Sequence, residues 1–188
     1  EFFTADNLFI PFPAVMVNHH GDGFLNTVHA FNRILNDVFE DDEINRTSLA
    51  EASIDVAIGN DIDTVAFFMS GQQPCKGEIS LELAVNGQTT TASLPIDLPR
   101  FQRSPLSLRE IFPGKSADGG VLKIHQPSQF MFYGRMFVTA QVADGAFSGN
   151  HSYYDMSEVE EYWDDAAASR RTYPFINGFD NRLRMYPI

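Results

Sequence analysis

Two histidines and an aspartate have the spacing of a known type of metal site. His20-Gly21-Asp22 is an H-x-D sequence, and one class of non-haem iron enzyme uses two histidines and one carboxylate around an open iron site. His125 could be the distal histidine, and Arg135 follows where such enzymes often hold the carboxylate of a cosubstrate. A metal-dependent enzyme built on this set is the alternative hypothesis for function.

The other histidines allow a second arrangement. His19, His20, His151 and Asp155 could gather around zinc or another divalent ion. Adjacent histidines on an extended segment point to opposite faces, so only one of the pair would normally be a ligand. The favoured interpretation is that Asp22 caps a helix while the histidines line a loop, and we expect no cofactor.

Aromatic residues are frequent in the C-terminal half and could bind a ligand. Flat rings on a sheet surface could stack on sugars, with Asn and Asp side chains binding the hydroxyl groups. Two adjacent aromatic residues on a strand point to opposite faces, so such a pair must place one ring outside the core. The predicted ligand-binding residues are Tyr133, Arg135, Tyr153, Tyr154 and Trp163.

The single cysteine, Cys75, can form no intrachain disulfide and no cysteine-based zinc site. Lys76 beside it could lower the pKa of the thiol slightly. A lone cysteine on a turn without a histidine partner is not expected to be a nucleophile.

The composition predicts a folded, acidic domain. The chain has 188 residues, 44% of them hydrophobic, and a formal net charge of −12 from 25 acidic and 13 basic residues. A nucleic-acid-binding protein needs a basic surface, and no cluster of Lys and Arg supplies one. No run of residues has the apolar length of a membrane span. We therefore expect neither nucleic-acid binding nor a transmembrane segment.

The amphipathic pattern after the first histidines predicts one long helix over residues 22–40. Asp22 would be its N-cap. Apolar residues then recur at steps of three and four: Phe24, Leu25, Val28, Phe31, Ile34, Leu35, Val38 and Phe39. This stripe predicts a helix that packs on a sheet or on a partner.

From residue 52 onward the pattern changes to that of strands. Ile79, Leu81, Leu83 and Val85 alternate with smaller or polar residues, as in a strand with one buried face. The next two residues are Asn-Gly, a strong hairpin signal. The stretch LSLREIF should form one or two helical turns before Pro113-Gly114. At least seven strands after one helix, without βαβ alternation, favour an antiparallel β-sandwich.

Part of the strand region resembles a known family. Residues 52–139 contain a strand and an Asn/Asp turn (IGNDIDTVAFF), a Leu/Val hairpin, the stretch SLPIDLPRFQRSPLSLREIF and the Arg-bearing strand FMFYGRMFV. In this order they resemble the β-sandwich domain of sensory rhodopsin transducer-like proteins. The resemblance implies a non-enzymatic, oligomeric sandwich that acts in binding or signalling.

The sequence therefore predicts a mainly β protein, an antiparallel β-sandwich with one long N-terminal amphipathic helix. Residues 1–155 would form the sandwich domain and include the helix at 22–40. Residues 156–188 would form an aromatic and charged C-terminal extension that packs on it. The expected function is a non-catalytic binding or assembly module with a carbohydrate or protein ligand. Its apolar helix stripe and Pro-broken terminal strands favour a homo-oligomer.

Overall fold

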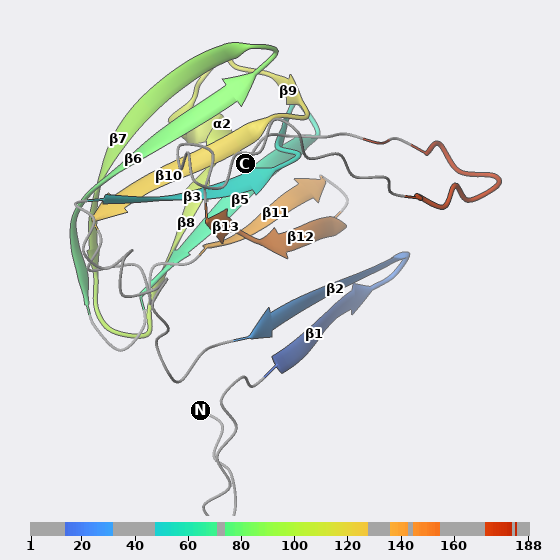
Figure 1. Cartoon of the computed structure of the whole chain (residues 1–188), viewed down its shortest axis with the longest axis horizontal. Coiled ribbons are helices and arrows are strands. Elements are labelled where there is room, and N and C mark those ends of the chain that lie inside the picture. Colours follow the sequence, from blue (N-terminus) through green and yellow to red (C-terminus); the bar gives the residue numbers. More distant parts are fainter. Residues whose placement is uncertain are drawn as a thin grey trace, which may run out of the picture.

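The protein is mainly β, and its strands form several antiparallel sheets (Figure 1). The structure is a computed structural model that describes residues 14–31, 48–70, 74–127, 136–142, 145–154, 172–181 and 183. Within these ranges the regular structure comprises thirteen strands and one short helix. None of the helical structure there is long and apolar enough to cross a membrane.

The first element is a hairpin, and this corrects the predicted N-terminal helix. Strands β1 (Ala14–Gly21) and β2 (Phe24–Phe31) pair antiparallel around the two-residue turn Asp22-Gly23. Phe24, Asn26 and Val28 are at least partly buried, whereas Leu25 and Thr27 between them are exposed. Burial therefore alternates with the period of a strand. The predicted helix is wrong for Phe24–Phe31, and its remaining residues, 32–40, lie outside the described residues.

The larger sheet has five strands in the order β13-β3-β10-β6-β7. Three of its four pairings join strands that are distant in the sequence, and only β6 and β7 are joined by a tight turn. The five strands are β3 (Ser48–Ile54), β6 (Cys75–Val85), β7 (Gln88–Leu98), β10 (Val121–Pro127) and β13 (Tyr153–Tyr154).

The second sheet has four strands in the order β12-β11-β5-β8. These are β5 (Ile62–Met69), β8 (Arg103–Ser107), β11 (Met136–Val142) and β12 (Phe147–His151). A short pair, β4 (Ala57–Ile58) with β9 (Ala117–Asp118), lies at one end. The buried hydroxyl of Thr64 holds β4 beside β5, because it accepts from the Ala57 N–H at 2.8 Å and donates to the Ala57 carbonyl at 3.0 Å.

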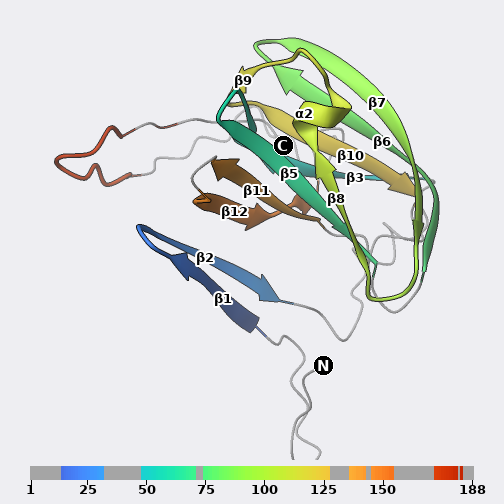
Figure 2. The same cartoon turned by 180° about the vertical axis from the view of Figure 1, so that it is seen from behind.

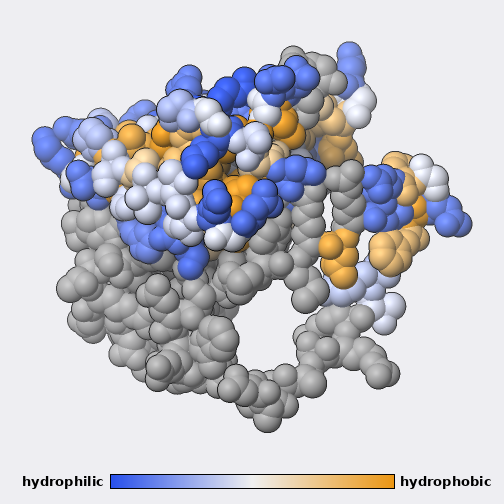
Figure 3. Space-filling model, turned by 90° about the horizontal axis from the view of Figure 1, so that it is seen from above, coloured by the Kyte–Doolittle hydropathy of each residue, from blue (hydrophilic) through white to orange (hydrophobic). Residues whose placement is uncertain are grey.

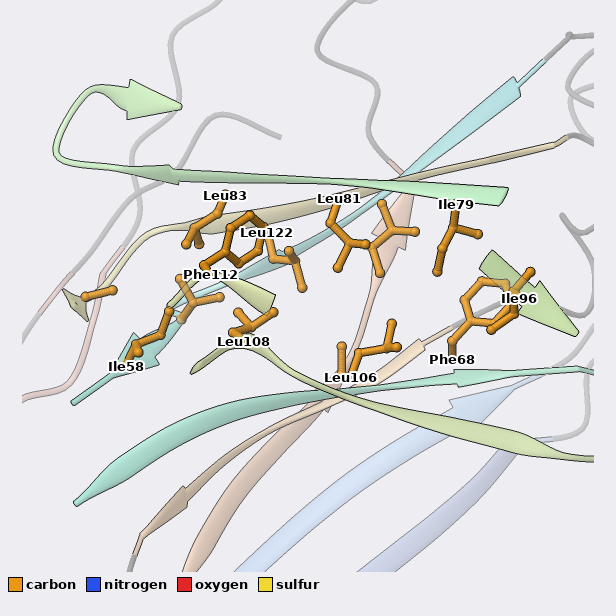
Figure 4. Close-up of a cluster of buried hydrophobic side chains, with 14 of the residues drawn as sticks. Ile58, Phe68, Ile79, Leu81, Leu83, Ile96, Leu106, Leu108, Phe112 and Leu122 are labelled. Atoms are coloured by element: carbon orange, nitrogen blue, oxygen red, sulfur yellow. The ribbon is translucent and has the colours of Figure 1, made fainter. Parts of the chain in front are cut away.

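The hydrophobic core lies between these two sheets (Figure 4). Ile79, Leu81 and Leu83 of β6 point toward Phe68 of β5 and Leu106 of β8. The intervening residues of β6 are exposed or half-buried, so the alternation seen in the sequence is the alternation of core and surface.

The short helix α2 (Leu108–Ile111) begins where β8 ends, within the stretch LSLREIF, which was expected to form one or two helical turns. Ser107 caps it, and its hydroxyl accepts from the Glu110 N–H at 3.2 Å. The Asp63 carboxylate accepts from the Ser107 hydroxyl at 2.6 Å and from the Arg109 N–H at 3.1 Å. These bonds tie the helix to β5 and direct Leu108 into the core.

Candidate binding surface

The inner face of the β1–β2 hairpin packs on β12 (Figure 2). The Phe147 ring of β12 lies 5.2 Å from the Phe24 ring and 5.2 Å from the His19 ring, measured between centroids. Asn26 adds a polar contact, because its Oδ1 accepts from the Gly149 N–H at 3.0 Å. These contacts orient the hairpin against β12, the edge strand of the four-stranded sheet.

One polar atom in this contact is buried without a hydrogen-bond partner, the amide nitrogen Nδ2 of Asn26. The other end of the same side chain is bound to Gly149, which fixes the orientation of the amide. A buried donor without an acceptor costs roughly 1–3 kcal/mol. The contact between the hairpin and β12 therefore contains a buried polar group whose hydrogen-bonding capacity is not met.

The outer face of the hairpin is exposed and partly apolar. Met16 and Leu25 are 63% and 70% exposed. Between them the Thr27 hydroxyl donates to Asn18 Oδ1 at 2.8 Å across the two strands. The paired strands therefore hold two large apolar side chains outward on a regular surface.

A second exposed apolar group lies near the C-terminal end. A tight turn joins Ile176 to Phe179, with the Phe179 N–H donating to the Ile176 carbonyl at 3.3 Å. Asn181 braces it, since its Oδ1 accepts from the Ile176 N–H at 2.9 Å and its Nδ2 donates to the carbonyls of Ile176 and Phe179 at 2.8 and 2.9 Å. The large side chains exposed on this segment are Tyr173, Phe175, Ile176, Phe179 and Leu183.

We call residues 172–181 and 183 the C-terminal turn segment. Figure 1 shows it projecting from the sheets on the side toward which the β1–β2 turn also points. Seen from above, its apolar residues lie beside hydrophilic ones at the projecting end (Figure 3). The side chain of Phe179 is 73% exposed although the backbone around it is fixed by four hydrogen bonds. Its exposure is therefore a property of an ordered turn.

The predicted metal-site residues lie on different elements. His20 is exposed near the end of β1, and Asp22 is exposed in the turn. His125 lies on β10, with Nε2 3.8 Å from Glu82 Oε2, and His151 ends β12, with Nδ1 2.7 Å from the Ser152 carbonyl oxygen. In the part of the chain that the structure describes, no three His, Cys, Asp or Glu residues form a group that could hold a metal ion.

The predicted ligand-binding residues are only partly covered by the described ranges. Tyr153 and Tyr154 form β13, which pairs with β3 at Ala52 and Glu51. Their side chains, and all of Tyr133, Arg135 and Trp163, lie outside the described residues. Their role in binding remains a prediction, as does the metal-dependent enzyme.

Cys75 differs from its predicted environment. It is buried at the start of β6, and burial raises the pKa of its thiol. Lys76 points the other way and binds Asp97, with Nζ 3.0 Å from Oδ2. The lysine therefore does not activate the sulfur, and a strand beginning at Cys75 explains the difference from the expected turn.

The hairpin, though not the exposure of its outer face, could have been found in the sequence. Asp22-Gly23 is a two-residue hairpin signal, and Gly23 has a φ of +84°, which glycine adopts without strain. The apolar stripe that follows Asp22 favours a helix N-cap at this position instead. Comparison with protein-family models, curated proteins and solved structures finds no match for this chain.

Proposed function

We propose that this chain is a β-sandwich that acts as a non-catalytic binding or assembly module, with a protein as its ligand. Two observations support the sandwich: the core cluster takes side chains from both large sheets, and each sheet is antiparallel. The resemblance of residues 52–139 to the sandwich of sensory rhodopsin transducer-like proteins implies the same class of role.

The observation that carries the proposal is the outward display of apolar side chains on hydrogen-bonded turns. Leu25 stands beside the Asn18–Thr27 bond, and Phe179 stands on the turn braced by Asn181. Groups of large apolar side chains that stay exposed on an ordered element mark interaction sites in many proteins. Here two such elements project from the sheets.

The chemistry of these side chains favours a protein over a carbohydrate ligand. Met16, Leu25 and Ile176 are aliphatic and offer no flat ring on which a sugar could stack, whereas Tyr173, Phe175 and Phe179 do offer rings. The Asn181 amide is occupied by the backbone of its own turn, so it is not available to sugar hydroxyls. An apolar protein surface complements such a set, since interface cores are enriched in aromatic residues and Met.

A photo-crosslinking experiment tests this proposal. A photoreactive phenylalanine analogue is placed at Leu25 or at Phe179, and crosslinked proteins are identified after irradiation of cells that produce the chain. Each candidate is then purified and its affinity measured by calorimetry. We expect Phe179→Ser and Leu25→Ser to weaken binding at least about tenfold, as for central interface residues.

Matched variants separate binding from folding. Phe179→Leu and Leu25→Met keep the apolar surface and should bind within about threefold of the wild type, since volume-conserving apolar exchanges cost little. All four variants should unfold at nearly the wild-type denaturant concentration, because the replaced side chains are exposed. A purified partner whose affinity is unchanged by both serine variants would contradict the proposal.

A further inference from the structure

Strand β7 forms one edge of the five-stranded sheet. Its neighbour among the described strands is β6 alone, and Figures 1 and 2 show it along the rim of the molecule. At eleven residues it is, with β6, the longest strand described. A long edge strand presents backbone N–H and C=O groups to any chain that can pair with it.

Two independent features show which residues of β7 direct their backbone N–H and C=O groups away from β6. The turn Asn86-Gly87 is closed by the pair Val85–Gln88, and the pair that closes a two-residue hairpin is hydrogen-bonded. Pairing then alternates, so Gln88 and every second residue bond to β6. Pro95 has no N–H and falls on the other parity, as this alternation requires. Thr89, Thr91 and Ser93 therefore direct their N–H and C=O groups away from β6.

The two halves of this edge differ. In the second half, Pro95 offers no donor and Asp97 carries a charge held by Lys76 at 3.0 Å. Proline and charge are the usual devices that prevent edge pairing. In the first half, residues 88–94 read QTTTASL and contain neither. Residues 88–94 are therefore the part of the β7 edge with which another strand could pair.

The open half is chemically suited to a second copy of itself. A chain with a net charge of −12 repels its own copies over most of its surface, but residues 88–94 are uncharged. In an antiparallel pair centred on Thr91, Thr89 of one copy lies opposite Ser93 of the other. Each residue whose N–H and C=O groups point away from β6 then lies opposite such a residue of the other copy. Pro95 lies opposite Gly87, beyond the paired segment.

We infer that two copies of this chain associate through the Gln88–Leu94 half of β7, pairing antiparallel about a two-fold axis at Thr91. The core side of the strand supports this. Ala92 and Leu94 point toward the core cluster but are only partly buried, and a strand added beyond β7 would cover their exposed flank. The outer side would carry directly opposed Thr and Ser side chains, which are favourable cross-strand pairs.

This association is separate from the surface assigned to a protein ligand. The Leu25 and Phe179 side chains lie on the hairpin and on the C-terminal turn segment, and neither belongs to the five-stranded sheet. An edge pairing of seven residues buries less than the roughly 1,200 Å² of a standard stable interface. We therefore expect a weak dimer in rapid exchange, which forms as the concentration is raised.

Sedimentation equilibrium over a concentration series tests the inference with two lysine variants, Thr91→Lys opposite Glu82 of β6 and Thr89→Lys opposite Ala84. Thr91→Lys places two ammonium groups directly opposite one another, with their Cβ atoms about 5 Å apart, and should weaken the dimer at least about tenfold. Thr89→Lys places each ammonium opposite Ser93, roughly 13 Å along the strand from its copy. That distance exceeds the screening length of about 8 Å at physiological salt, so this variant should remain within about threefold of the wild type.

Cysteine crosslinking checks the register without relying on charge. Thr91→Cys brings two sulfurs together across the axis, since opposed residues in such a pair lie about 5.5 Å apart at Cα, within the range of a disulfide. Thr89→Cys separates them too far to react within the dimer. We expect a crosslinked dimer for Thr91→Cys and none for Thr89→Cys under mild oxidation. The native Cys75 is buried and should not contribute.

Each result bears on the inference. A concentration-dependent dimer that Thr91→Lys weakens and Thr89→Lys leaves intact, with crosslinking at position 91 alone, would support it. A wild-type chain that stays monomeric at millimolar concentration would overturn it, as would a dimer that Thr91→Lys does not weaken. Should Thr91→Lys fail to fold by circular dichroism, the crosslinking pair decides, and equal crosslinking at both positions would refute the register.

Discussion

Two hairpins of this protein each turn on two residues, the second of them a glycine, and differ in almost everything else. β6–β7 turns at Asn86-Gly87 and β1–β2 turns at Asp22-Gly23, and both close with a two-residue loop. In β6, Ile79, Leu81 and Leu83 are buried in the core between the sheets, and Val85 is partly buried against it. In β2 the alternating set packs on one edge strand, while Leu25 on the other face stays exposed.

The difference shows when the spacing of apolar residues distinguishes a strand from a helix and when it does not. The polar and small residues between Ile79, Leu81 and Leu83 exclude a helix. In β2 both faces carry apolar residues, so Phe24, Leu25, Val28 and Phe31 fit steps of three and four as well as alternation. The sequence of a hairpin that is apolar on both faces can therefore show the same apolar spacing as an amphipathic helix. We expect substitutions in the two hairpins to differ in the same way in their effects on the free energy of unfolding.

The largest effect should come from the core-facing strand. Leu81 is fully buried among side chains from both sheets, and Leu81→Ala should lower the free energy of unfolding by about 2–5 kcal/mol, as expected for a cavity in a packed core. Leu25→Ala, the same substitution on an exposed face, should change it by less than about 0.5 kcal/mol. Urea denaturation followed by circular dichroism measures both. Equal losses would show that the outer face of the hairpin is buried in solution.

A smaller effect is expected at the two turns. Gly87 and Gly23 have φ angles of +73° and +84°, and a Cβ at either position would meet no atom within 4 Å. Alanine should therefore cost only the conformational penalty of about 1–2 kcal/mol. Gly87→Ala should lower global stability by this amount, because the turn holds the core hairpin. Gly23→Ala should instead speed amide hydrogen exchange in β1 and β2 only, and a global loss equal to that of Gly87→Ala would remove the distinction between the hairpins.

The smallest effect concerns the thiol. The pKa of Cys75 is raised above its ordinary value of 9.0 by burial, so the folded state favours the protonated thiol. Its contribution to stability is complete below pH 9 and is lost as the pH rises through the folded-state pKa. Urea midpoints should fall in the wild type as the pH is raised above 9, and fall less in Cys75→Ala. In a Leu25→Cys variant, a thiol reagent should modify position 25 rapidly and Cys75 only after denaturation.

The sequence allowed the β6–β7 hairpin, the helical turn at residues 108–111 and the mainly β character to be predicted, because each rests on a local signal. Asn86-Gly87 is a strong local signal for a two-residue hairpin turn, and Ser107 is a favourable N-cap for the helix that follows it. Sheet order could not be predicted in this way. The pairing of β10 with both β3 and β6 joins segments far apart in the chain, and no local pattern specifies which strands become neighbours.

The candidate binding surface was equally inaccessible to local patterns. Leu25 and Phe179 are apolar, and their types alone would assign them to a core. Their exposure depends on what lies beside each turn after folding. Aromatic pairs and histidines are more conspicuous in the sequence, and one such pair, Tyr153 and Tyr154, forms β13.

The sheet order also governs how the chain can fold while it is being made. β3 has two neighbours, β10 and β13, and both are encoded after it; Ser48 of β3 pairs with Pro127 of β10. At a synthesis rate of about 5–20 residues per second, β3 leaves the ribosome several seconds before either neighbour exists. Until then both of its edges are open to other nascent chains. The order of strands in the five-stranded sheet thus leaves β3 without its neighbours for longer during translation than any other described strand of that sheet.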